Sequence, residues 1–235
     1  TEPQTPLPGL PEAYSALASG HFEQVLIWAD IAEKAGVDVV PWLSLKAVAL
    51  SLLLRPNDAL PVYHWLCAAE PGNPAHWSNL GNCLCELERE REALEPLQKA
   101  LLLGAVEPAL HYGLARAYAA SEQLELARRH IETAMARDPD DSEFELFHLR
   151  LLQAMDRWPE AQALAERLQG LPLNEGQRVD LAYLLFRGQW YAQAIAIFQS
   201  PVVDSDLAMD AKIGLIMTYE RVNRMPEALA LQAQV

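Results

Sequence analysis

One small residue recurs along the chain at an almost constant interval. The series begins with a valine and continues with alanines, at Val25, Ala59, Ala93, Ala127, Ala161, Ala194 and Ala228. Each step is 34 residues except one, which is 33. A fixed period of this length indicates that one supersecondary motif is repeated. The series predicts seven repeats, and it restricts the fold to a linear array in which each repeat contacts its neighbours.

Each repeat carries a helical pattern of apolar residues in two successive runs, and the small residue opens the second run. A small side chain suits this position, because two antiparallel helices approach each other most closely near the turn that joins them. The pattern is clearest between residues 73 and 139. Its two copies are Trp77, Leu80, Gly81, Leu84, Ala93, Leu97 and Ala100, then His111, Leu114, Ala115, Tyr118, Ala127, Ile131, Ala134 and Pro139.

Capping residues predict where several of these helices begin. Asn73 precedes Pro74, which is the arrangement of an N-cap residue followed by a first-turn proline. Two further sites have the spacing of a capping box, with Ser142 before Glu145 and Asn174 before Gln177. The local signals therefore agree with the repeat register.

The two aligned copies resemble the tetratricopeptide repeat, whose first helix carries Trp, Leu-Gly and Tyr and whose second carries Ala, Phe, Ala and Pro. The resemblance implies an all-α, right-handed superhelical solenoid of about seven antiparallel helix hairpins. Residues 1–11, with four prolines, are expected to be a leader or linker before a single solenoid domain over 12–235. The expected repeats are 12–39, 40–73, 74–107, 108–141, 142–174, 175–208 and 209–235, and the last of these is incomplete.

The resemblance also implies where a ligand binds. In this family the first helix of each hairpin lines the concave wall of the superhelix, mainly from its second, fifth, ninth and twelfth positions. These positions and their immediate neighbours predict a partner-binding groove. Its candidate residues are Asn82, Tyr112, Arg116, Arg150, Gln153, Tyr183, Phe186, Arg187 and Met217.

Arginines beside aromatic residues and methionine give this predicted groove its chemistry. Arginine can hold a carboxylate through two hydrogen bonds, and aromatic rings supply apolar contact. We therefore expect a protein or peptide partner with acidic or C-terminal carboxylate groups. The alternative is that Arg187 stabilises a helix C-terminus, and that Arg116 and Arg150 are solvated or pair with Glu143 and Glu145.

Residue types that perform catalysis or bind metals do not occur in a recognisable arrangement. Cys83 and Cys85 would point to helix faces about 200° apart, which does not suit one tetrahedral ion. We expect them to be buried structural thiols, and the histidines show no ligand spacing. Phosphate-binding loops and nucleophile motifs do not appear. The sequence predicts no catalytic, cofactor or metal site, and a protein that is not an enzyme.

The tryptophans fall mostly at helical packing positions. We therefore expect them to lie in the core rather than in a ligand cage. Those considered are Trp42, Trp65, Trp77, Trp158 and Trp190.

Charge and cysteine usage limit the class of partner and the compartment. The formal net charge is −14, which disfavours nucleic acid and anionic membrane surfaces as partners. No apolar stretch is long enough to span a membrane. Three cysteines do not form a disulfide framework, which favours a reducing, cytoplasmic compartment, and the composition is typical of bacteria.

The predicted function is a non-catalytic scaffold that binds a peptide or partner protein in its concave groove. One alternative is the recruiting arm of a larger bacterial enzyme of sulfotransferase or glycosyltransferase type, because the seventh repeat stops early. Another is a periplasmic protein of envelope assembly or polysaccharide export, if a signal peptide preceded Thr1. An uncapped last repeat would also favour a homodimer through that repeat.

Overall fold

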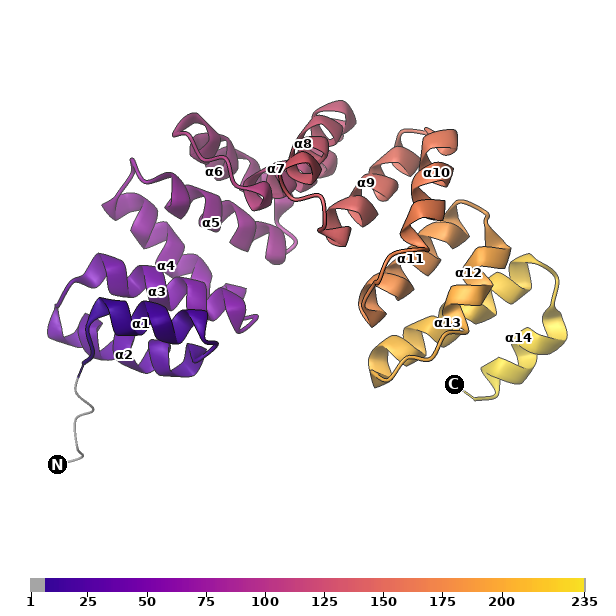
Figure 1. Ribbon diagram of the computed structural model, residues 1–235, viewed down its shortest axis with the longest axis horizontal. Helices are drawn as coiled ribbons and strands as arrows, with labels where there is room; N and C mark the ends of the chain where they lie inside the picture. The colour runs from indigo at the N-terminus through magenta and orange to yellow at the C-terminus, as the bar shows by residue number, and fades with distance from the viewer. Residues whose placement is uncertain (1–6, 235) are drawn as a thin grey trace. The chain divides into compact units, whose positions relative to one another are not determined.

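The computed structural model describes residues 7–234, and within them it contains fourteen α-helices and no β-strand. The chain divides into two compact units, an N-terminal unit that ends at His130 and a C-terminal unit that begins at Ile131. Figure 1 shows the helices of each unit packed side by side. Of the leader predicted for residues 1–11, residues 1–6 lie outside the part of the chain that the structure describes.

The N-terminal unit contains α1 (Leu10–Ala18), α2 (Phe22–Ala35), α3 (Val39–Leu52), α4 (Pro56–Ala69), α5 (Pro74–Glu86), α6 (Glu90–Leu102) and α7 (Pro108–Ala120). The division between the units falls within α8 (Leu124–Arg137). The C-terminal unit contains α9 (Ser142–Ala154), α10 (Trp158–Leu168), α11 (Glu175–Arg187), α12 (Tyr191–Phe198), α13 (Ser205–Arg221) and α14 (Met225–Gln232).

Consecutive helices pack as hairpins. Contacts join α1 to α2, α3 to α4 and α5 to α6 in the N-terminal unit, and α9 to α10, α11 to α12 and α13 to α14 in the C-terminal unit. The Nδ1 atoms of His111 and His130 lie 3.0 Å apart and link α7 to α8. The described residues therefore confirm the predicted all-α array of seven hairpins.

The small-residue series lies at the centre of these hairpins. All seven members, from Val25 to Ala228, have no exposed surface. They allow the paired helices to approach closely, while larger residues such as Leu97 and Leu181 fill the space between neighbouring hairpins. The burial confirms the role that the series predicts.

The turn within each hairpin has one conformation throughout. The residue five positions before each member of the small-residue series has a positive φ, from 56° to 80°. The next residue donates its N–H to a carbonyl five residues back, as Arg55 does to Leu50 at 2.9 Å, which is a helix-ending Schellman bond. Glycine occupies this left-handed position only in the first hairpin. The full set is Gly20, Leu54, Glu88, Glu122, Asp156, Gln189 and Asn223.

Two of the three predicted helix starts are confirmed. Asn73 accepts a hydrogen bond from the Ala75 N–H, and Asn174 and Gln177 form a complete capping box. The prediction for Ser142 is wrong, because Asp141 caps α9 through the Glu143 N–H and Ser142 is already helical. Asp and Ser are about equally good N-cap residues. Which of Asp141 and Ser142 caps α9 therefore depends on the residue at which the chain enters the helix, and that residue is Asp141. The first helix begins at Leu10, inside the segment expected to be a leader.

The prediction that the tryptophans form core holds for Trp42, and Trp77 and Trp190 are partly buried against the core clusters, but the prediction is wrong for Trp65 and Trp158. Trp42 is buried, with 2% of its surface exposed, whereas Trp65 and Trp158 are 45% and 41% exposed. Both exposed rings stand on second helices of hairpins, α4 and α10, at positions that face outward. Helical spacing alone does not distinguish these faces when both carry apolar residues.

We expect Leu54→Gly to stabilise the protein by about 1 kcal/mol, because a side chain in left-handed backbone costs free energy that glycine avoids. Little packing is lost, since Leu54 is 87% exposed. The control is Leu52→Gly at the last residue of α3, which should destabilise by about 0.5–1 kcal/mol. Urea unfolding measures both, and a loss of stability with Leu54→Gly would contradict the analysis.

We expect Gly81→Ala to destabilise the N-terminal unit by about 1–3 kcal/mol, because a Cβ at Gly81 would collide with the buried Leu97 side chain. Gly72→Ala is the matched control, since a Cβ there meets no atom within 4 Å. Thermal unfolding followed by circular dichroism compares the two variants. Equal melting temperatures would show that α5 and α6 do not depend on this close approach.

Candidate functional site

The predicted groove residues of the N-terminal unit lie together on α5 and α7. The Oδ1 atom of Asn82 is 2.5 Å from where a Cβ on Gly113 would stand, so Asn82 lies directly against α7. The guanidinium of Arg116 lies over the Tyr112 ring, 5.9 Å from its centroid. The structure therefore brings Asn82, Tyr112 and Arg116 onto neighbouring first helices.

Arg116 already has partners inside the N-terminal unit. Its Nη2 donates to the Cys85 carbonyl oxygen and to Glu90 Oε1, each at 2.7 Å. Burial lowers the pKa of Arg116, but the hydrogen bond to Glu90 and the charge interactions with Cys85, Tyr112 and Glu90 together outweigh burial, so the pKa is raised. The charge of Arg116 is therefore compensated by Glu90 rather than by Glu143 or Glu145.

Two predicted residues on α9 differ in exposure. Gln153 is only 4% exposed and donates through Nε2 to the Leu184 carbonyl oxygen at 2.8 Å, which ties α9 to α11. Arg150 is exposed and forms no ion pair within the described residues. Its charge lowers the pKa of Asp180, although burial raises that pKa by more.

Tyr183 and Phe186 are half-buried on α11. The Tyr183 hydroxyl donates to the Asp210 carbonyl oxygen of α13 at 2.8 Å, and its ring meets the Phe198 ring edge-on at 5.0 Å. Phe186 packs against the Tyr191 ring, with centroids 5.7 Å apart. Both aromatic side chains are thus held in place and keep part of their surface open to solvent.

An apolar row runs along the exposed face of α13. Met209, Ile213 and Met217 are spaced four residues apart and are 38%, 40% and 40% exposed. Because the Tyr183 hydroxyl bonds α13 at Asp210, this row lies beside the aromatic residues of α11. The repeat positions select Met217 but not Met209, although the spacing of four residues between the apolar side chains is a signal in the sequence that identifies Met209 as well.

Arg187 lies in a different setting, at the turn between α11 and α12. It is exposed, forms no ion pair within the described part of the chain, and lines an open cavity of about 440 Å³. Two indole rings, Trp158 and Trp190, form part of the same cavity. Their helical spacing predicts a place in the core, so the sequence pattern does not associate these tryptophans with Arg187.

The cysteines have the surroundings of structural thiols. All three are buried and free, and the Cys83 and Cys85 sulfurs point to different partners, the Pro56 and Gly113 carbonyl oxygens. Within residues 7–234, His, Cys, Asp and Glu side chains do not gather in groups of three or more that could hold a metal ion. The helices of the same range include none long and apolar enough to cross a membrane.

No protein-family model matches the sequence, and no curated protein is significantly similar to it. Solved structures do match the fold. TTC0263, a TPR protein of Thermus thermophilus, is 22% identical with a TM-score of 0.57, over 75% of this chain and 97% of its own. PilF of Pseudomonas aeruginosa is 18% identical with a TM-score of 0.61, over 80% of this chain and 86% of its own.

A third match extends over nearly all of this chain. The APC/C hetero-tetramer Cut9–Hcn1 contains a chain that is 15% identical with a TM-score of 0.64, over 95% of this chain and 44% of that one. These matches agree with the array of helix hairpins that the structure shows. The chain therefore has the tetratricopeptide-repeat fold.

We expect the three thiols to react slowly with Ellman's reagent in the native protein. Burial raises the pKa of Cys67 and Cys83 to about 11 and that of Cys85 to about 12. Since the thiolate is the nucleophile, a higher pKa leaves less of it at pH 8, and the rate should be at least about 100-fold below that of the urea-unfolded chain. The rate should also rise between pH 8 and 10, and a fast pH-independent reaction would contradict this.

Proposed function

We propose that this protein is a non-catalytic scaffold that binds a peptide segment of another protein on the first helices of its hairpins. The tetratricopeptide-repeat fold supports the class of function. The Cut9–Hcn1 match also supports it, because that structure is an assembly of two different proteins. The proposed binding surface of the C-terminal unit is formed by Arg150 on α9, Tyr183 and Phe186 on α11, and the apolar row of α13.

The apolar row of Met209, Ile213 and Met217 is the observation that carries the proposal. Three apolar side chains, each exposed by more than a third, form one continuous stripe on a helix whose other faces are packed. Methionine adapts its shape to different partners, and half-buried aromatic rings add contact area at low entropy cost. The stripe suits an extended segment with apolar side chains at regular intervals.

Charge supports acidic groups in the same ligand. Arg150 and Arg187 are exposed and form no salt bridge among the described residues, so both can bind a carboxylate. Arg150 lowers the pKa of Asp180 through its charge alone. Arg116 differs, since Glu90 already compensates it. In the N-terminal unit, Asn82 and Tyr112 remain a separate part of the proposed surface. The buried Gln153 would not contact the ligand but would hold α9 against α11 beneath the C-terminal surface.

We expect Met217→Asp to weaken binding of a selected peptide at least about tenfold, because a carboxylate interrupts the apolar stripe and repels acidic ligands. Peptides are selected from a random library on the wild-type chain, and their dissociation constants are measured by fluorescence anisotropy. Arg150→Gln should reduce affinity only for those selected peptides that carry acidic residues.

Met225→Asp is the matched control, since Met225 is a methionine of similar exposure, 44%, on the neighbouring helix α14. It should leave the affinity unchanged. If both variants lose affinity equally, or if neither loses affinity, the peptide does not bind on α13 and the proposal is wrong.

A further inference from the structure

One position of the repeat carries an indole in the N-terminal unit and a carboxylate in the C-terminal unit. Trp77 in α5 donates its indole N–H to the Pro71 carbonyl oxygen at 2.9 Å, in the loop before the helix. Lys99 of α6 lies over the same ring, with Nζ 3.8 Å from the centroid. The ring thus fills the space between the loop and the second helix.

Two repeats further along the chain, the same three positions are occupied by Pro139, Glu145 and Arg167. Arg167 Nη2 lies 3.0 Å from Glu145 Oε1, so a cation again covers the side chain at this position. A carboxylate is much smaller than an indole and has no N–H to give to the loop. We attribute the space left here to this exchange of Trp for Glu.

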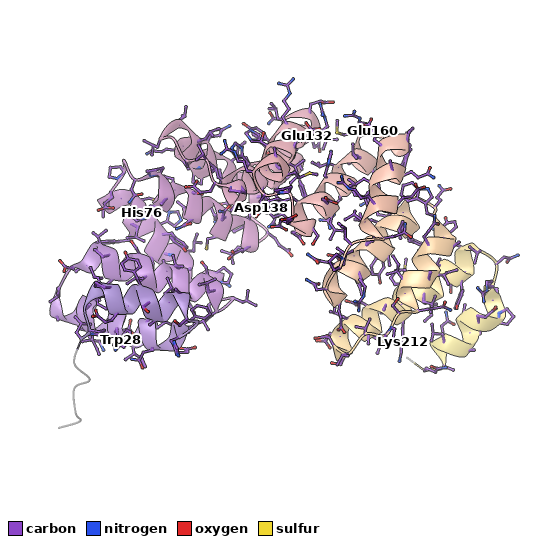
Figure 2. The ribbon with its side chains drawn as sticks, in the orientation of Figure 1. Trp28, His76, Glu132, Asp138, Glu160 and Lys212 are labelled. Atoms are coloured by element: carbon purple, nitrogen blue, oxygen red, sulfur yellow. The ribbon has the colours of Figure 1, made fainter. Side chains whose placement is uncertain are left out.

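A cavity of about 240 Å³ occupies that space in the C-terminal unit. Its walls come from the loop before α9, the first turn of α9 and the loop between α10 and α11. Asp138, which Figure 2 labels at the end of α8, immediately precedes the first wall residue. The lining residues are Pro139, Asp140, Ser142, Glu145, Leu171 and Pro172.

The cavity is lined by the buried Glu145 carboxylate, of which one oxygen pairs with Arg167 and the other has no hydrogen-bonding partner among the described residues. Glu145 is 8% exposed, and its Oε2 is buried without a hydrogen-bond donor among the described residues. A buried acceptor left in this way carries a desolvation cost that an incoming hydrogen-bond donor would remove. Rotation about the soft terminal torsion of Glu145 can turn Oε2 toward an incoming donor. Arg167 compensates Glu145, whereas Asp140 is exposed without an ion pair within residues 7–234, so the cavity retains one uncompensated negative charge.

We propose that this cavity binds the guanidinium group of an arginine side chain presented by a partner protein. A guanidinium is planar, as the indole of Trp77 is, and it has donors for both Glu145 and Asp140. The apolar walls formed by Pro139, Leu171 and Pro172 suit the methylene stem of arginine. One positive charge balances the uncompensated negative charge, and the −14 charge of the chain steers basic partners toward it.

A divalent cation fits the cavity less well. Calcium takes six to eight oxygen ligands, and magnesium requires near-octahedral geometry. The cavity offers two carboxylates and one hydroxyl, beside three apolar residues, and one carboxylate already binds Arg167. The guanidinium site is also separate from the apolar row of α13, so it does not depend on the function proposed above.

The test is a titration of the ¹⁵N-labelled chain with N-acetyl-arginine methylamide, followed by NMR. Its isostere N-acetyl-citrulline methylamide has the same shape without the charge. We expect saturable shifts of the Asp140, Ser142 and Leu171 amides with the arginine probe, and an affinity at least about tenfold lower for citrulline. Equal curves for both probes, no saturable shift, or shifts with calcium chloride but not with arginine would overturn the proposal.

Variants test which groups hold the probe. Asp140→Asn keeps the cavity and should weaken arginine binding at least about tenfold. Asp156→Asn is the matched control, because it removes the same charge beyond the other end of α9 and should change nothing. Equal effects of the two would mean that only net charge attracts the probe, which overturns the site.

Glu145→Trp places an indole where Trp77 stands in the N-terminal unit. We expect it to fill the cavity, abolish the arginine shifts and raise the melting temperature, and retained binding in the folded variant would overturn the proposal. If this variant does not fold, the effect of Asp140→Asn on arginine binding still tests the proposed site. Met217→Asp should bind the arginine probe as the wild type does, so a failure of the groove proposal remains distinguishable.

Discussion

The close approach of two helices at a fully buried small residue is the constraint on which every hairpin depends. Where Ala93 or Ala194 lies, there is no room for a longer side chain, and a turn with one left-handed residue closes the pair. That backbone is retained even where glycine is replaced by leucine or glutamate, which means that hairpin packing offsets the local cost. The repeated geometry sets each first helix against the second helix of its own hairpin in the same way.

Because the hairpin geometry is held by a few buried positions, the remaining positions of the repeat can change their chemistry. On α13 the outward positions form the apolar stripe proposed to bind peptide, while Arg116 at a comparable position of α7 bonds to its own unit. The position of Trp77 is another case, since Glu145 replaces the ring and leaves a lined cavity. Function in this array is therefore expected at individual repeats rather than uniformly along it.

The fold could be predicted almost entirely, because period, helical spacing and capping are local properties of the sequence. The candidate site could be predicted only in part. The repeat positions select Tyr183, Phe186 and Met217, and these lie on neighbouring helices with open surface. They do not show that Gln153 faces the Leu184 carbonyl, or that Trp158 joins Arg187 at a cavity, since these contacts depend on how one hairpin packs on the next.

The sequence by itself determined the number of hairpins, the helix pairs and the buried small residues, because each follows from a short pattern repeated in register. Only the tertiary structure decided which charges are compensated, which aromatic rings are exposed and where space is left. Arg116 on α7 bonds to Glu90 at the start of the neighbouring helix α6. The cavity beside Glu145 exists only where two loops meet the start of α9. Such features depend on side-chain volumes and distances between segments far apart in sequence, which periodicity does not specify.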